Sequence, residues 1–108
     1  MIRLAFVLAL LPGLAAAQSF DGVYQSGGCT AGVSDSRLSI EGSSIRFWES
    51  SCQLKNPVAV RDMNGATLFD VTCSGEGETW SYRALLMQGR EGLIMVRDGY
   101  AFTYPRCD

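Results

Sequence analysis

The 108-residue sequence contains no histidine, one lysine and only three prolines. Without histidine the chain cannot assemble a Ser-His or Cys-His nucleophile. Its four cysteines lack the CxxC spacing of a zinc finger or ribbon, so we expect no metal site. Basic residues do not cluster, and 11 acidic residues outnumber nine lysines and arginines, which argues against a nucleic acid or an anionic membrane surface as partner. The composition therefore predicts a protein that is not an enzyme and holds no cofactor.

Long hydrophobic runs are also missing, apart from one near the N-terminus. Residues 1–17 carry a positive charge at Arg3, an apolar run over Leu4–Leu11, and the small residues Ala15–Ala17 that a signal peptidase reads. We expect an export signal that is cleaved before Gln18. The alternative, a membrane anchor, needs about 20 apolar residues, and this run is much shorter. The sequence thus predicts one small soluble domain over residues 18–108, located in the periplasm or secreted, with no membrane span.

All four cysteines, Cys29, Cys52, Cys73 and Cys107, lie in the exported part. An even number in a short chain bound for an oxidising compartment indicates two disulfides, each worth about 2–4 kcal/mol. In an up-and-down order of strands, Cys52 and Cys73 come to the same end of the sheet. This order favours Cys52–Cys73 with Cys29–Cys107. The sequential pairing, Cys29–Cys52 with Cys73–Cys107, stays open if the last strand bends after Pro105.

The middle of the chain alternates apolar and polar residues, which is typical of strands with one buried face. Folding about Asn64-Gly65 predicts that Val58 faces Val71 and that Val60 faces Phe69. Folding about the next turn, 75–78, extends the same buried face, includes Trp80 in the core and places an ion pair on the outer face. The pairs predicted there are Phe69 with Ala84, Val71 with Tyr82, Cys73 with Trp80, and Asp70 with Arg83.

Shorter hairpins are predicted on both sides of this segment. Residues 38–40 and 45–47 fold about 41–44, which sets Ile40 opposite Ile45 and Leu38 opposite Phe47, while Asp98-Gly99 joins 93–97 to 100–104. Phe20–Gln25 makes a first strand. Both faces are apolar in 85–87 and in 93–96, so the register across Gln88–Gly92 is ambiguous and allows a bulge. Leu68 and Leu85 point outward. Together these features predict an all-β antiparallel meander of about eight strands, forming a barrel or a curled sandwich.

Two adjacent aromatic rings give the clearest candidate site. Because neighbouring strand residues point to opposite faces, Phe47 belongs in the core and Trp48 on the outer face with Arg46, across from Arg37. Trp48 is either a half-buried residue capped by arginine or, with Arg46 and Arg37, part of a partner-binding surface, since Trp and Arg are enriched in binding hot spots. The Gly- and Ser-rich loop 26–36 is a contact loop or a lid.

Acidic residues do not suggest catalysis. Glu76 and Glu78 lie at an exposed hairpin tip, where nothing is expected to raise a carboxyl pKa or to exclude water. Neither this tip nor the segment around Asp35 has the ligand spacing of a calcium loop.

Shortly after its leader, the chain has a GxY motif, Gly22-Val23-Tyr24, and with its leader and few cysteines it resembles short exported bacterial proteins. Its size and the segment around Phe47-Trp48 resemble the small periplasmic inhibitors of c-type lysozyme, a family of all-β barrels. That family presents a Ser-Gly-x-x-Tyr loop, whereas this chain has Ser-Gly-Gly-Cys-Thr over 26–30, so the resemblance assigns no inhibitory residue.

We therefore expect a binding or accessory protein whose partner is a protein or small ligand of the cell envelope. The alternatives are an inhibitor of an exported hydrolase and a structural accessory of an envelope assembly.

Overall fold

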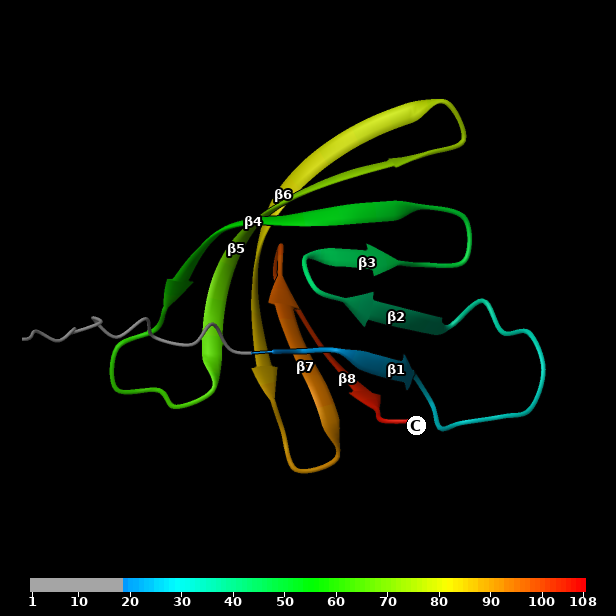
Figure 1. Cartoon of the computed structure of the whole chain (residues 1–108), viewed down its shortest axis with the longest axis horizontal. Helices are drawn as coiled ribbons and strands as arrows, with labels where there is room; N and C mark the ends of the chain where they lie inside the picture. Colours follow the sequence, from blue (N-terminus) through cyan, green and yellow to red (C-terminus); the bar gives the residue numbers. More distant parts are fainter. Residues whose placement is uncertain (1–18) are drawn as a thin grey trace, which may run out of the picture.

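A computed structural model describes residues 19–108, and the predicted signal peptide over 1–17 lies outside this range. Eight strands follow one another along the chain, each antiparallel to the next, in a single sheet of order β1 to β8 (Figure 1). Their bounds are β1 Gly22–Gln25, β2 Arg37–Glu41, β3 Ser44–Arg46, β4 Ser51–Ala59, β5 Ala66–Gly75, β6 Glu78–Gln88, β7 Gly92–Arg97 and β8 Tyr100–Pro105. The predicted meander of eight strands is confirmed.

The sheet curls into a nearly closed barrel around one apolar core. Its inner face is built from alternate residues of each strand, as the period of two requires. The largest fully buried side chains are Tyr24, Leu38, Ile45, Leu86, Leu93, Val71, Cys52 and Cys73. Phe47 is partly buried and packs against this cluster, whereas its neighbour Trp48 is exposed. The opposite orientations predicted for these two rings are confirmed.

The β5–β6 hairpin has the predicted register along its whole length. Phe69 pairs with Ala84, Val71 with Tyr82 and Cys73 with Trp80. On the outer face, Arg83 Nε lies 3.8 Å from Asp70 Oδ1. The register from Gln88 to Leu93 continues without a shift, which resolves the ambiguity at that turn. Leu68 and Leu85 are paired on the outer face and are half-buried.

The predicted pairing of β4 with β5 is wrong. Val58 lies opposite Leu68 instead of Val71, and a β-bulge between Lys55 and Val58 shifts the register within the strand by one residue. Asn56 has a φ of 52° in the bulge and donates a hydrogen bond of 2.8 Å from Nδ2 to Asp70 Oδ2. A shift of one residue exchanges the faces of a strand, which explains why Val58 is exposed. The turn is also longer than predicted, since Asn64-Gly65 belongs to a loop over 60–65.

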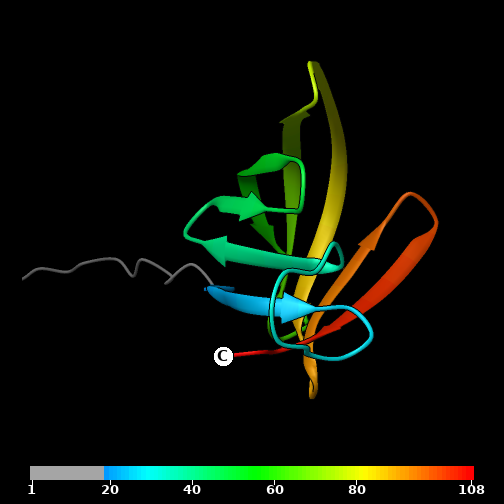
Figure 2. The same cartoon turned by 90° about the vertical axis from the view of Figure 1, so that its right-hand side faces the viewer.

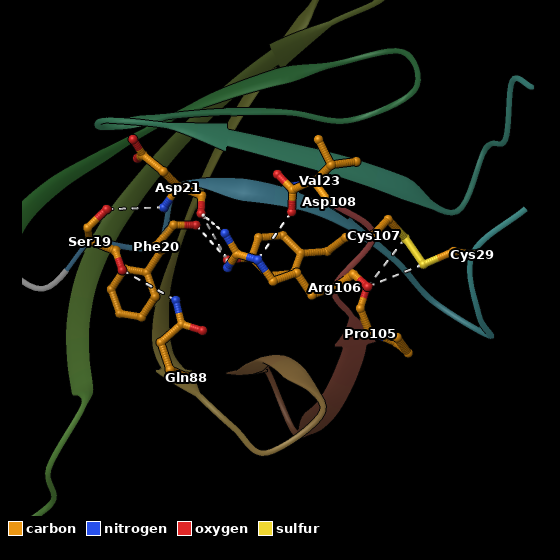
Figure 3. Close-up of polar contacts among 11 residues, drawn as sticks. Ser19, Phe20, Asp21, Val23, Cys29, Gln88, Pro105, Arg106, Cys107 and Asp108 are labelled. Atoms are coloured by element: carbon orange, nitrogen blue, oxygen red, sulfur yellow. Dashed lines mark hydrogen bonds and ion pairs between the residues drawn. A yellow bond between two sulfur atoms is a disulfide. The ribbon is translucent and has the colours of Figure 1, made fainter. Parts of the chain in front are cut away.

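The barrel closes at a short contact between β1 and β8, which we call the seam. A single bridge pairs Tyr24 with Arg106, and Cys107 N donates to Val23 O at 2.7 Å. The Arg106 guanidinium reaches across to Asp21 O at 2.9 Å and to the Tyr24 hydroxyl at 3.2 Å (Figure 3). The C-terminal residues thus hold the first strand against the last.

Both disulfides have the favoured pairing, Cys29–Cys107 and Cys52–Cys73. Cys52–Cys73 joins two directly opposed residues of β4 and β5 inside the core. Cys29–Cys107 ties the loop between β1 and β2 to the seam (Figure 3). Two such crosslinks fit a protein that folds in an oxidising compartment. Within residues 19–108, no helix is long and apolar enough to span a membrane.

Trp80 is not a core residue, contrary to the prediction. It lies opposite Cys73 as expected, yet 38% of its surface is exposed. The reason is the length of the β5–β6 hairpin. β7 pairs only with Leu85–Gln88 of β6, so the first half of β6 extends past the next strand (Figure 2).

Candidate binding surface

Where the barrel wall opens, its inner face continues as a surface of aromatic side chains. β6 carries two of them, and β8 carries three at alternate positions. Arg97 at the end of β7 lies between the two groups, because it pairs with Tyr100 and its side chain reaches Tyr82. We call this surface the aromatic face. Its residues are Trp80, Tyr82, Arg97, Tyr100, Phe102 and Tyr104.

Strand register explains why these residues share one face. Met95 and Leu93 point into the core, and their partners on β8 are Phe102 and Tyr104. Side chains of paired residues lie on the same side of a sheet, so the β8 rings face inward as well. The β7–β8 hairpin stands away from the tip of β5–β6, as Figure 2 shows, and this separation leaves the rings accessible.

The rings contact one another in a row. The centroids of Tyr100 and Phe102 are 5.8 Å apart, and those of Phe102 and Tyr104 are 6.0 Å apart. The Arg97 guanidinium carbon lies 3.3 Å from the centroid of the Tyr82 ring, in a cation–π contact. The same guanidinium forms an ion pair of 2.8 Å with Asp98. These contacts hold the long Arg97 side chain in place.

The environment changes the acidity of two phenols on this face. Burial raises the pKa of Tyr82 above 10.0, and the positive charge of Arg97 opposes that change. Burial also raises the pKa of Tyr104, and nearby Tyr82 contributes in the same direction. The inner part of the aromatic face is therefore partly desolvated, whereas its outer part is open, with Tyr100 63% and Phe102 37% exposed.

No protein-family model matches the chain, and neither curated proteins nor solved structures show significant similarity to it. The function of the candidate site is therefore inferred from the chemistry of its own residues. Tyr, Trp and Arg are the residues most enriched in binding hot spots. Tyr and Trp bury a large area at a small cost in conformational entropy, and Arg adds a charged group that stacks on aromatic rings. The aromatic face is suited to binding.

The partner-binding residues predicted from the sequence lie in two places. Trp48 is 52% exposed in the turn after β3, and Arg46 is exposed beside it. The hydrogen bonds that Arg37 donates do not go to Trp48. Its Nη2 donates to Gln25 Oε1 at 2.8 Å and to Thr30 O at 2.7 Å. Because β3 ends at Arg46, Trp48 has no paired position opposite Arg37.

Loop 26–36 is held by a small polar network. Gln25 is buried and donates from Nε2 to Thr30 Oγ1 at 2.9 Å, while its Oε1 accepts from Arg37. Ser26 N donates to Ser36 O at 3.0 Å across the base of the loop. With Cys29 bonded to Cys107, both ends and the middle of the loop are anchored.

Carboxyl groups gather near the tip of β5–β6. A hydrogen bond between the side chains of Glu76 and Glu49 raises the pKa of Glu76, and their like charges raise it further. The expectation that nothing perturbs this tip is thus wrong. The 47–50 turn lies against Gly75, where a Cβ would come within 2.5 Å of Glu49 O, so only glycine fits there. Glu76 and Glu49 are exposed, and the hollow of about 290 Å³ that Glu49 lines beside Trp48 is open to solvent, which suits a charged rim rather than acid–base catalysis.

A separate cleft of about 1040 Å³ lies at the opposite end of β5, beside the 60–65 loop. Its walls include Phe20, Leu54, Met63 and Phe69, with the carboxylates of Asp21 and Asp62 at the surface. The volume is at the upper end of the range for small-ligand sites, but the walls offer no lysine or arginine. Within residues 19–108, no cluster of His, Cys, Asp and Glu is arranged to hold a metal ion.

Sequence reasoning missed the aromatic face. A signal for it exists in Tyr-Ala-Phe-Thr-Tyr over 100–104, where every second residue is aromatic. That pattern also suits an ordinary core strand. The distinction depends on how far β6 and β7 overlap, which only the assembled sheet decides.

Proposed function

We propose that this protein is exported to the periplasm or secreted, and that it acts there as a non-enzymatic binding protein. Its binding surface is the aromatic face, and its partner is a protein. The leader pattern and the two disulfides support the compartment. The observation that carries the proposal is the row of contacting rings beside Arg97, open to solvent at Tyr100 and Phe102.

A protein partner suits this surface better than a small ligand. The three β8 rings stand side by side, with interplanar angles of 27° and 32° between neighbours, so each covers part of the face of the next. Broad, shallow surfaces of Tyr, Phe and Trp with one Arg are typical of the central part of protein interfaces. A small ligand would need an enclosed site such as the cleft beside the 60–65 loop.

Capture from an envelope extract tests the proposal. The purified protein is immobilised, and its Tyr100→Ala variant is compared with Val33→Ala, another strongly exposed position, in the 26–36 loop. We expect Val33→Ala to retain the partner and Tyr100→Ala to bind about 30-fold more weakly, the loss of about 2 kcal/mol typical of a hot spot. If Trp48→Ala with Arg46→Ala loses the partner while Tyr100→Ala retains it, the binding surface is the one predicted from the sequence.

Inhibition of an exported hydrolase is a second candidate, which one observation favours. The carboxylates of Glu49, Glu76 and Asp98 in the turns, with that of Glu78 at the start of β6, form an acidic rim near the aromatic face, and this rim suits a positively charged enzyme. The test is the rate of cell-wall lysis by a purified c-type lysozyme with the protein at micromolar concentration. An unchanged rate excludes that target, and an exported protease is then assayed in the same way.

A further inference from the structure

The outer edge of β8 has backbone groups without a partner among residues 19–108. β8 is the last strand of the sheet, and β1 meets it only at the seam, where Tyr24 pairs with Arg106. β1 ends at Gln25, and the chain then turns away into loop 26–36. Residues 100–104 therefore form an open edge, visible on the outer side of the β7–β8 hairpin in Figure 2.

Hydrogen bonds at the seam show which groups point to this edge. Arg106 N donates to Glu91 O, on the β7 side, and Cys107 N donates to Val23 O, on the β1 side. Successive residues of a strand direct their N–H and C=O groups to opposite edges. Counting back from Cys107, Ala101 and Thr103 direct theirs to the open edge. Both residues are exposed.

Natural proteins usually protect such an edge with charged residues, proline or a bulge. Residues 100–104 carry no charge and no proline, and their pairing with β7 has no bulge. Pro105 limits the edge at one end and the Asp98-Gly99 turn at the other. The edge therefore has a defined length and a free row of donors and acceptors, which suits the addition of one more strand.

We infer that a second copy of this chain occupies the edge, with the two β8 strands antiparallel and Phe102 on the two-fold axis. In this register Ala101 lies opposite Thr103 of the other copy, and these pairs satisfy every N–H and C=O group that Ala101 and Thr103 direct outward. Tyr100 lies opposite Tyr104, so aromatic residues also match aromatic residues.

The sequence around Phe102 is what favours a second copy over another extended segment. Tyr-Ala-Phe-Thr-Tyr has the same pattern of large and small side chains in both directions, which an isologous interface requires. Moving the axis to Ala101 leaves Thr103 opposite Gly99 in the turn, and moving it to Thr103 leaves Ala101 opposite Pro105, which has no N–H to donate. The pairing joins two aromatic faces into one, and it does not depend on the partner proposed above.

Sedimentation of the purified protein over a range of concentrations tests the inference. We expect a dimer for the unchanged protein and for Thr103→Val, which keeps the backbone donor. Thr103→Pro removes that donor without affecting the bonds to β7 and should give a monomer. A monomer at all concentrations for the unchanged protein, or a dimer that Thr103→Pro leaves intact, would overturn the inference.

Because Thr103→Pro also risks disturbing the strand, crosslinking provides a second measurement. Phe102→Cys places two thiols directly opposite each other across the axis, in a non-hydrogen-bonded pair about 4.5 Å apart at Cα, so it should oxidise to a disulfide-linked dimer. Tyr100→Cys lies opposite Tyr104 of the other copy and should stay unlinked. Equal crosslinking of both variants, or of neither, contradicts the register. A mass increase seen only when a different protein is added would identify that protein as the occupant instead.

Discussion

Removing the disulfide at the seam tests how the barrel is held closed. The change is Cys29→Ala with Cys107→Ala. Cys29 lies in an exposed loop and Cys107 is only partly buried, so the substitution removes little packing. What it removes is a crosslink over a sequence separation of 78 residues. In the chain-entropy account, a loop of this length restricts the unfolded chain by about 4.5 kcal/mol at 25 °C.

Cys52–Cys73 closes a separation of 21 residues, for which the same relation yields about 3.3 kcal/mol. Its sulfurs are buried, however, so replacing them also costs packing in the core. The seam disulfide is therefore the better test of crosslinking alone. Its loss matters because only one bridge and a few side-chain contacts otherwise join β1 to β8.

The assay is urea unfolding at equilibrium, followed by the fluorescence of the two tryptophans. We expect the double variant to lose about 4.5 kcal/mol of unfolding free energy, which is a large part of the stability of a small domain. Val33→Ala, in the same loop, should change it by less than about 0.5 kcal/mol. A loss below about 1 kcal/mol for the double variant would refute the reasoning, because the crosslink would then restrict the unfolded chain far less than its loop length implies.

Two further predictions concern the two sides of the sheet. Leu86→Ala should destabilise the fold by about 2–5 kcal/mol in urea unfolding, because Leu86 is fully buried, whereas Leu85→Ala on the outer face should cost clearly less. Equal losses would contradict the assignment of faces. Ultraviolet titration should show Tyr82 and Tyr104 ionising above the ordinary pKa of 10.0. Since the folded pKa is raised, the stability that these phenols contribute is complete below pH 10 and is lost as pH rises through the higher folded values. Tyr82→Phe should remove a phenol that ionises above pH 10 from the titration curve. If the phenol that is lost instead ionises at the ordinary pKa, Tyr82 is not desolvated in the folded protein.

The sequence predicted some strands correctly and others wrongly, and the difference has a physical reason. Alternation and turn residues are local, so they were sufficient for the strand count, the β5–β6 register and the outward position of Leu68 and Leu85. They failed at β4, because the chain turns through the longer loop 60–65 instead of the two residues Asn64-Gly65, and a bulge between Lys55 and Val58 then shifts the register again. The up-and-down order favoured the observed disulfide pairing but left the sequential pairing open.

What only the tertiary structure decided is which inner-face residues are covered. The period of two assigned Trp80 and Tyr82 to the inner face, but it could not show that β7 ends before reaching them. Tyr100, Phe102 and Tyr104 look in sequence like a core strand, and they become a surface because the barrel wall opens beside them. A strand's pattern specifies its faces, whereas exposure depends on the length and curvature of its neighbours, which are encoded elsewhere in the chain.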